Sequence, residues 1–541
     1  MRKNEIYPME ISGMTNEGNG VGRIQGLAVF VPMTAVGDQI NVRIVKVLKN
    51  YAYGIVESIR LPSAARKAPD CAVYAKCGGC AFQHITYAEE LKMKYQFVAD
   101  AFSRLGGISC VPDKILESPA SIRYRNKAQF PLGESADGKA VCGFFAGRSH
   151  RIIPCTDCLL QPVLFGKILD VILEWANQYQ IPVYRETERK GLLRHVYLRQ
   201  GEATGEVMVC LVATEERLPY QQALLERLQI FPEVRSVILN KNDRDTNVVL
   251  GPECITLWGK DTISDILCGV RVELSPLSFY QVNRAGAEQL YREVERLANL
   301  SGEECLLDLY CGAGTIGLSM AGKVKKMLGV EIVPEAIDNA RRNAEQNSIV
   351  NAEFLCADAG AAAQTLEQQG FRPDVIIVDP PRKGCSIDTL EAMVRMAPHK
   401  IVMISCNPST AARDCRILQE KGYDVDYIRP VDMFPRTTHV ETVVLLSKLK
   451  VDHHIEIELK MDELDLTAAE SKATYDEIKA YVFDKYGLKV SQLYIAQVKR
   501  KCGIIERKNY NVSKKEDAKV PQCPPEKEAA IMDALKHFQM I

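Results

Sequence analysis

Residues 305–317 read CLLDLYCGAGTIG, an apolar run followed by a glycine-rich turn and the start of a helical segment. Glycines in such a turn let the backbone approach a nucleotide-like ligand closely. A glycine pattern alone is weak evidence, but Glu331 ends the next apolar run, LGVE, about twenty residues further on. A carboxylate at that place can accept hydrogen bonds from both hydroxyls of a ribose. The spacing therefore predicts a nucleoside-binding site.

The same alternation of apolar runs and helical segments continues on both sides of this stretch. The apolar runs are CLLDLY, KKMLGVEIV, AEFLCAD, DVIIVDP, KIVMISC, DVDYIRPV and ETVVLLSKL. Such a pattern indicates a doubly wound, mainly parallel α/β sheet. The fourth run leads into Asp379 and the loop DPPR, which two prolines stiffen over the same cleft. The order resembles Rossmann-like S-adenosylmethionine methyltransferases more than dinucleotide dehydrogenases. The alternative is that these are strand-end turns of another α/β enzyme.

Two reactive side chains follow at later strand ends. The run KIVMI delivers Cys406 to the carboxyl edge of the sheet, just before a helix whose positive end favours a thiolate. Glu441, in the run HVET, begins the last strand and is a candidate general base. The competing interpretations are a buried structural thiol for Cys406 and a helix-capping carboxylate for Glu441. His439 is interpreted as structural.

A nucleophile and a base of this kind suit methylation of a poorly nucleophilic ring carbon such as C5 of uracil. A thiolate adds at C6 and pushes electron density onto C5, which then attacks the methyl group. A base afterwards removes the C5 proton so that the cysteine can leave. Uracil in a folded RNA hides its C6, so the nucleotide must first be turned out of its stack or already lie in a loop.

With DLYCGAG, DPPR, SCNPST and HVET in this order, residues 9–449 resemble the bacterial RNA (uracil-C5)-methyltransferase family. The resemblance implies Cys406 as nucleophile and Glu441 as proton acceptor. It also implies that the donor and uracil pocket is lined by Gln281, Tyr310, Glu331, Asp358 and Asp379. Within the family the chain resembles the branch that acts on 23S ribosomal RNA, because that branch carries a TRAM domain and an iron–sulfur site. The transfer RNA branch normally lacks both.

A cysteine cluster precedes the catalytic motifs. Cys71, Cys77 and Cys80 lie on one short stretch, and Cys158 offers a fourth thiol from a distance. Four thiolates can hold a four-iron, four-sulfur (4Fe-4S) cluster, although the same set could bind zinc. Cys155 competes with Cys158 as the fourth ligand. The spacing and the resemblance favour iron–sulfur with a structural or RNA-folding role.

The rest of the chain divides into further regions. We predict an OB-like β-barrel of the TRAM type with five strands over residues 1–60, and a linker with the cysteine loop over 61–95. A helix is expected over residues 87–105. A central α+β RNA-binding domain is expected over 96–270, the methyltransferase domain over 271–450, and an extension of unknown role over 451–541.

Two groups of basic and aromatic residues in the central region are candidate RNA contacts. One is the run IRYRNK, residues 122–127, and the other comprises Arg194, His195 and Arg199. Such side chains suit phosphate contact and base stacking. Each group is also compatible with an ordinary solvated strand face.

Composition bounds the rest. With 541 residues the chain is long enough for several domains, and its net charge of −1 neither requires nor excludes a nucleic acid. No signal peptide or long apolar span is evident, so we expect a cytoplasmic protein with eighteen reduced cysteines, no membrane contact, and a monomeric state.

The first prediction is thus S-adenosylmethionine-dependent methylation of C5 of a uridine in 23S ribosomal RNA, with the T-loop uridine of transfer RNA as the alternative. A radical S-adenosylmethionine methylthiotransferase also combines TRAM with clustered cysteines, but it needs a Cys-x3-Cys-x2-Cys motif that the cluster lacks. An RNA-binding module with a degenerate core would require the loss of Cys406 or Glu441.

Overall fold

The computed structural model describes residues 1–147, 149–449, 475–502, 523–538 and 540. The chain divides into two compact units, Met1–Lys450 and Val451–Ile541. Among the described residues, no helix combines the length and apolar character needed to cross a membrane.

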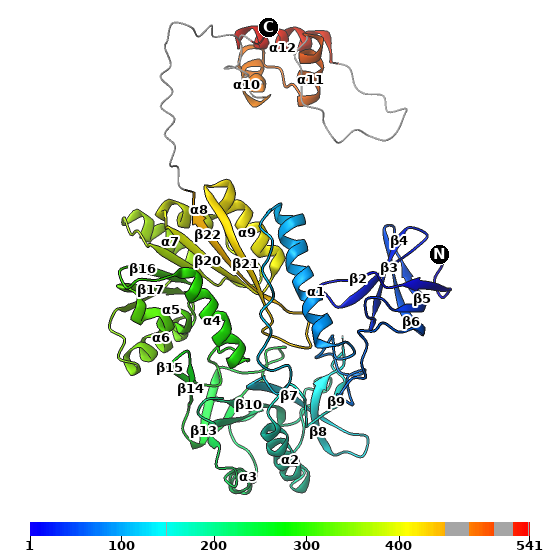
Figure 1. The fold of residues 1–541 in the computed structure, drawn as a ribbon, viewed down its shortest axis with the longest axis vertical. Coiled ribbons are helices and arrows are strands. Elements are labelled where there is room, and N and C mark those ends of the chain that lie inside the picture. Colours follow the sequence, from blue (N-terminus) through cyan, green and yellow to red (C-terminus); the bar gives the residue numbers. More distant parts are fainter. Residues whose placement is uncertain (148, 450–474, 503–522, 539, 541) are drawn as a thin grey trace. The chain divides into compact units, whose positions relative to one another are not determined.

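A seven-stranded sheet forms the catalytic half of the first unit, with the order β18-β17-β16-β19-β20-β22-β21 (Figure 1). Its first five strands are parallel and β22 runs antiparallel to both of its neighbours. The strands are β16 Cys305–Leu309, β17 Lys326–Glu331, β18 Ala352–Cys356, β19 Val375–Val378, β20 Lys400–Ser405, β21 Tyr423–Val431 and β22 Glu441–Lys448. All seven coincide with the apolar runs of the sequence. The predicted Rossmann-like methyltransferase fold is confirmed.

Helices cover both faces of this sheet. One face packs against α4 Arg284–Ala298, α5 Thr315–Met320, the 3-10 turn η2 Ala321–Lys323 and α6 Pro334–Gln346. The other packs against α7 Ala359–Gln368, α8 Ile387–Met396, α9 Pro408–Glu420 and α1 Tyr87–Asp100. The strands are buried on both sides, which explains why they read as continuous apolar runs.

The helix predicted over residues 87–105 is present as α1 and a π-helical continuation, η1 Ala101–Gly106, that ends at Gly107 with φ +66°. Its apolar side chains, among them Leu91, Val98 and Phe102, join the methyltransferase core. The structure therefore places residues 96–106 on the methyltransferase sheet rather than in the central domain. Likewise, the hairpin of β14 Ile263–Leu267 and β15 Val270–Leu274 packs beside α4. Burial of one amphipathic face decides these boundaries, which sequence composition does not reveal.

The central domain contains a second seven-stranded sheet, with the order β13-β12-β11-β10-β7-β8-β9. Its strands are β7 Lys127–Glu134, β8 Ala140–Phe145, β9 Ile152–Pro154, β10 Leu193–Gln200, β11 Val207–Ala213, β12 Val234–Lys241 and β13 Glu253–Gly259. The helices α2 Val163–Gln178 and α3 Gln221–Leu228 pack with this sheet around one core, which includes the buried Trp175. Strand β10 therefore lies in the middle of the sheet.

The N-terminal domain is a small sheet with the order β1-β5-β6-β4-β3-β2. Its strands are β1 Ile6–Glu10, β2 Gly13–Met14, β3 Asn19–Ile24, β4 Leu27–Pro32, β5 Gln39–Val47 and β6 Tyr51–Leu61. The five predicted strands become six because the first changes partner midway: Ile11 N donates to Asp38 O, whereas Ser12 N donates to Val21 O. This change of partner closes the sheet into a barrel.

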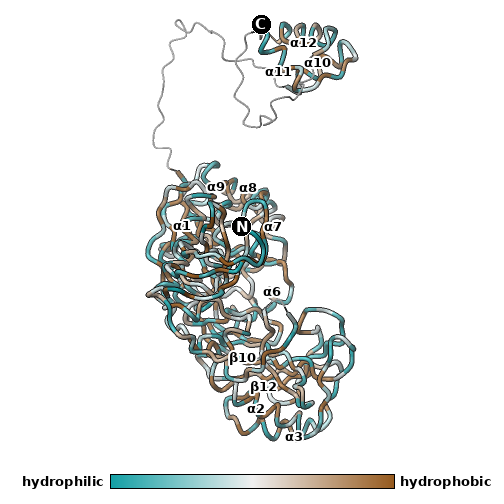
Figure 2. The backbone as a smooth tube through the Cα atoms, turned by 90° about the vertical axis from the view of Figure 1, so that its right-hand side faces the viewer, coloured by the Kyte–Doolittle hydropathy of each residue, from teal (hydrophilic) through white to brown (hydrophobic). Residues whose placement is uncertain are grey.

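The second unit contains three helices in its described part: α10 Tyr475–Tyr486, α11 Gln492–Lys501 and α12 Pro525–His537. Hydrophobic and hydrophilic stretches alternate along them, and their apolar sides form one small core (Figure 2). Residues 451–474 and 503–522 of the predicted extension lie outside the described residues.

Candidate active site and cysteine cavity

Cys406 lies where β20 gives way to α9, at the carboxyl edge of the catalytic sheet. Asn407 caps α9, with its side chain accepting from Ser409 N at 3.1 Å. The Nδ2 atom of Asn407 donates to Arg382 O at 3.1 Å, which ties this turn to the DPPR loop. The thiol is half-buried. The nucleophile candidate is therefore held by two loops that meet at one sheet edge.

Glu441 lies across the strand ladder from Cys406. Ser405 pairs with Thr442 in the antiparallel register of β20 and β22, so the next position brings Cys406 opposite Glu441. Glu441 is only 9% exposed. Burial, and after it the charge of Asp379, raises the pKa of Glu441 to about 8. A carboxyl group with such a pKa is suited to accept a proton near neutral pH.

Arg382 is a cation that acts on both groups, and it was not among the predicted site residues. Burial, followed by the charges of Glu441 and Asp379, raises the pKa of Cys406, whereas Arg382 opposes this shift and donates a hydrogen bond to the thiol. Arg382 likewise lowers the pKa of Glu441. The expected activation of the thiol by the helix end is thus outweighed in the free protein. The signal in the sequence was the arginine of DPPR itself.

The acidic residues of the donor site converge at the ends of three neighbouring strands. Glu331 accepts from Gly312 N at 3.1 Å and from Ile332 N at 2.8 Å. Burial raises the pKa of Asp379 to about 6. Burial also raises the pKa of Asp308 to about 7, and the charges of Asp379 and Glu331 add to this shift.

The glycine-rich turn leaves room for a ligand. Gly312 has φ +55°, and a Cβ there would meet nothing within 4 Å. In the described part of the chain, Asp308 Oδ1 is buried without a hydrogen-bond partner. An open backbone cradle next to acidic groups fits a nucleoside with a cationic sulfonium.

Tyr310, Asp358 and Gln281 differ in how the structure uses them. Tyr310 has φ +64°, and burial raises the pKa of its hydroxyl to about 12, with a smaller contribution from Asp358. Asp358 caps α7, accepting from Gly360 N at 3.0 Å. Gln281 is half-buried in the segment before α4, where its backbone carbonyl accepts from Asn126 Nδ2. Asp358 thus lies near enough to Tyr310 for its charge to act on the hydroxyl. The hydrogen bond described for Gln281 is made by its backbone carbonyl and not by its side chain.

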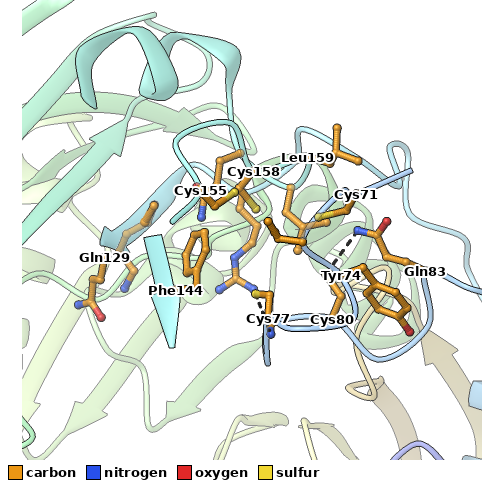
Figure 3. Close-up of a pocket in the computed structure, with 17 residues that line it drawn as sticks. Cys71, Tyr74, Cys77, Cys80, Gln83, Gln129, Phe144, Cys155, Cys158 and Leu159 are labelled. Carbon is orange, nitrogen blue, oxygen red and sulfur yellow. Dashed lines mark hydrogen bonds between the residues drawn. The ribbon is translucent and has the colours of Figure 1, made fainter. Parts of the chain in front are cut away.

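Five cysteines line one cavity of about 280 Å³ between the loop before α1 and the segment before α2 (Figure 3). They are Cys71, Cys77, Cys80, Cys155 and Cys158. All are free thiols. The competing candidates Cys155 and Cys158 both face the cavity, so the structure does not separate them. Among the described residues, no three Cys, His, Asp or Glu side chains come close enough to share a single metal ion.

The two arginines of the second predicted RNA-contact group are buried. Arg199 is 1% exposed and donates to Ser275 O and Ser278 O, both at 2.6 Å. Arg194 is 6% exposed and donates to Asn242 O and Arg244 O at 2.8 Å. Burial lowers the pKa of His195 to about 4. The prediction was wrong because β10 is an interior strand, whose polar side chains satisfy backbone carbonyls.

The first predicted RNA-contact group is also used internally. Tyr124 is buried and donates to Pro435 O at 2.9 Å. Arg123 donates to Cys158 O and Gln161 O, which tethers the cysteine segment. Arg125 and Lys127 line the cysteine cavity. The run IRYRNK therefore joins the central domain to its neighbours, and only Ile122 is exposed among these six residues.

The fold and the converging strand ends define a Rossmann-like methyltransferase that uses S-adenosylmethionine. Residues 271–449 match the tRNA (Uracil-5-)-methyltransferase family, and residues 2–56 match the TRAM domain. The chain is 44% identical over 448 residues to an RNA methyltransferase of Clostridium tetani, covering 83% of this chain and 97% of that protein. It is 41% identical over 450 residues to the RNA methyltransferase BH0687 of Halalkalibacterium halodurans, covering 82% and 98%.

A solved structure agrees with these relatives. The fold matches Pyrococcus abyssi tRNA (uracil-54, C5)-methyltransferase in complex with S-adenosyl-L-homocysteine with a TM-score of 0.67 and 29% identity. The match covers 81% of this chain and 100% of that one. The chain belongs to the S-adenosylmethionine-dependent RNA (uracil-5-)-methyltransferase family.

Proposed function

We propose that this enzyme methylates C5 of a uridine in 23S ribosomal RNA, in the cytoplasm and as a monomer, with Cys406 as nucleophile and Glu441 as base. The observation that carries the chemistry is the register of β20 and β22, whose last pair, Ser405 and Thr442, places Cys406 opposite Glu441 at the next position. A thiol and a proton acceptor on adjacent strands can reach C6 and C5 of one uracil ring, since those carbons are directly bonded.

We propose that methylation proceeds in three steps. The Cys406 thiolate forms a bond to C6, and the electron pair of the C5–C6 double bond moves toward C5 and the O4 carbonyl. C5 takes the methyl group of S-adenosylmethionine, and S-adenosylhomocysteine leaves. Glu441 takes the proton from C5, the double bond re-forms, and the bond between sulfur and C6 breaks. Arg382 favours the anionic state of Cys406 and Glu441 before RNA enters.

The donor site is proposed to use the predicted residues in distinct ways. Glu331 binds the ribose hydroxyls, and Asp358 and Tyr310 lie near the adenine end. Asp379 and Gln281 complete the lining of the donor and uracil pocket. The buried, unpartnered oxygen of Asp308 and the open space at Gly312 support this assignment.

The cysteine cavity supports a 4Fe-4S cluster rather than zinc. Zinc holds four sulfurs at about 2.3 Å from one point, whereas an iron–sulfur cluster spreads its four thiolates around a larger core. Five thiols around one cavity of about 280 Å³ supply enough ligands for the larger group. Cys71, Cys77, Cys80 and Cys158 would hold it, and its role would be structural.

Transfer RNA is the second candidate substrate, since the Pyrococcus abyssi structure is that of a tRNA (uracil-54, C5)-methyltransferase. The preference for ribosomal RNA rests on the resemblance of the barrel and the cysteine cluster to the ribosomal branch of the family. The test incubates the purified chain and S-adenosylmethionine with unmodified 23S ribosomal RNA or transfer RNA transcripts and maps 5-methyluridine by mass spectrometry. We expect methylation of the ribosomal transcript alone. Methylation of the transfer RNA alone would overturn the proposed substrate and leave the chemistry intact.

A further inference from the structure

The connection between β21 and β22, residues 432–440, leads directly into Glu441 and is held by buried charges. Lys94 on α1 donates to Glu90 Oε1 at 2.8 Å, to Asp432 Oδ1 at 2.7 Å and to Phe434 O at 3.0 Å. The side chains of Glu90, Lys94 and Asp432 have no exposed surface. The first residue of the connection is therefore fixed to α1 by an ion pair that water does not screen.

A second cation completes this group. Arg436 N donates to Glu90 Oε1 at 2.7 Å, and Arg436 Nη1 lies 3.5 Å from Glu90 Oε2. The charges of Glu90, Lys94, Asp432 and Arg436, which we call the buried quartet, sum to zero. Tyr87 adds a hydroxyl that donates to Asp432 Oδ2 at 2.8 Å. Buried ion groups add little stability compared with apolar side chains, but a fully bonded one holds a particular geometry.

The loop that carries Cys71, Cys77 and Cys80, here called the cysteine loop, also makes hydrogen bonds to this connection. The backbone amides of Ala81 and Phe82, which directly follow Cys80, donate to Arg436 O at 2.8 and 3.1 Å. Arg436 has φ +70°, a backbone conformation that a non-glycine residue keeps only when its surroundings impose it. The connection is thus fixed at one strained residue by both α1 and the cysteine loop.

Two further hydrogen bonds reach neighbouring carbonyls of the connection. Tyr124 Oη donates to Pro435 O at 2.9 Å, and Asn283 Nδ2 donates to Met433 O at 2.9 Å. The TRAM barrel also contributes, because a Cβ added at Gly18 would lie 3.1 Å from Thr438 Cγ2. Every domain of the first unit therefore contacts the segment that precedes Glu441.

We propose that residues 432–440 are a positioning element for Glu441, held in place jointly by the buried quartet and the cysteine loop. The inference rests on the proposed role of Glu441 as the base. Cys406 is held by β20, Asn407 and the DPPR loop, whose Arg382 Nη2 meets the far end of the connection 3.3 Å from His439 Nε2. Loosening the connection at Asp432 and Arg436 should therefore displace the carboxylate more than the thiol. Formation of the covalent RNA adduct would continue, whereas proton removal and release of the methylated RNA would slow.

The first test compares two tyrosines of the same core region. Tyr87→Phe removes the hydroxyl that bonds Asp432, and Tyr423→Phe removes a buried hydroxyl that bonds Pro398 O at 2.9 Å. Formation and decay of the protein–RNA adduct are followed on denaturing gels with the RNA that the enzyme methylates. We expect Tyr87→Phe to slow decay by about tenfold with formation unchanged within about twofold, and Tyr423→Phe to change neither. Equal slowing of both steps in Tyr87→Phe, or an equal effect in Tyr423→Phe, would overturn the proposal.

The variant Glu441→Gln distinguishes the positioning role of residues 432–440 from the proposed role of Glu441 as the base. The variant should slow adduct decay more than Tyr87→Phe does, because it removes the base itself. If Glu441→Gln released its adduct at the wild-type rate, the proposed role of Glu441 would fail. If Glu441→Gln slowed decay and Tyr87→Phe did not, only the positioning role would fail.

The cysteine side is tested without reference to activity. Hydrogen exchange of the amides of residues 432–441 is compared between the wild type, Cys77→Ser and the control Cys254→Ser, whose thiol is exposed and remote from the cavity. We expect exchange in this segment to rise about tenfold in Cys77→Ser alone, since the Ala81 and Phe82 amides then hold Arg436 less firmly. Unchanged exchange would remove the cysteine loop from the proposal.

Discussion

Two groups of polar residues in this enzyme look alike in the sequence and differ in the structure. Cys406, Asp379 and Glu441 lie at strand ends of the catalytic sheet, where burial raises their pKa values and neighbouring carboxylates add to the shifts of Cys406 and Glu441. Arg194 and Arg199 lie within β10, where each donates to two backbone carbonyls. A charged residue at a strand end remains available for chemistry. A charged residue within an interior strand instead has its hydrogen-bonding groups occupied by neighbouring backbone groups.

The largest effect is expected at the catalytic edge. Cys406→Ala should lower turnover by at least about 10⁴-fold, because it removes the thiol that is proposed to add to C6. The matched control is Cys415→Ala, which removes a fully buried thiol from the core beneath the same sheet. That variant should keep its turnover within about threefold and lose about 1 kcal/mol of stability. Methylation assays measure turnover, and thermal melting measures stability. Comparable turnover in both variants would contradict the assignment of Cys406 as the nucleophile.

Arg199→Met tests the other side of the comparison. Replacing a buried guanidinium leaves the carbonyls of Ser275 and Ser278 without donors, which should lower the free energy of unfolding by about 3 kcal/mol. Denaturant unfolding measures the loss. RNA affinity, measured at a temperature where the variant is folded, should stay within about twofold. A large loss of RNA affinity in a stable variant would support the original prediction that Arg199 contacts RNA.

The pH dependence of turnover tests the roles of Glu441 and Cys406 at the catalytic edge. Glu441, with its pKa of about 8, must be deprotonated to accept the C5 proton, and Cys406 must be a thiolate to attack. Both requirements act in the same direction, and Glu441 alone accounts for about a tenfold rise, so turnover should rise by at least about tenfold from pH 7 to pH 9. In Arg382→Gln, which loses the cation that opposes both shifts, the rise should move to higher pH. A rate that falls over this interval would contradict the assignment of Glu441 as a base.

The smallest effect is expected at Asp358, which lies at a strand end but caps a helix. Asn caps helices about as well as Asp, so Asp358→Asn should change stability by less than about 0.5 kcal/mol. Donor affinity, measured by calorimetry, should change by less than about threefold. A tenfold weaker affinity would show that the charge of Asp358, rather than its cap, serves the donor.

The sequence was sufficient for the catalytic sheet and much less so for tertiary packing. The seven apolar runs became strands because burial on both faces leaves a continuous apolar signal. In contrast, the attachment of α1 to the methyltransferase core depends on which surface meets its apolar face. The role of Arg382 could be suspected from DPPR, but its effect on Cys406 and Glu441 arises from proximity in space. The buried quartet of Glu90, Lys94, Asp432 and Arg436 joins residues more than three hundred positions apart. A local sequence pattern therefore could not predict it.

The most direct test of the central claim is to trap the bond between Cys406 and the uracil ring. RNA transcribed with 5-fluorouridine in place of uridine has no C5 proton for Glu441 to remove, so the adduct should persist after methyl transfer. Incubation with S-adenosylmethionine, followed by proteolysis and mass spectrometry, identifies the cross-linked peptide. The account predicts a nucleotide attached to Cys406 in the wild type and no complex in Cys406→Ala. A complex that forms in Cys406→Ala, or attachment at another cysteine, would contradict it.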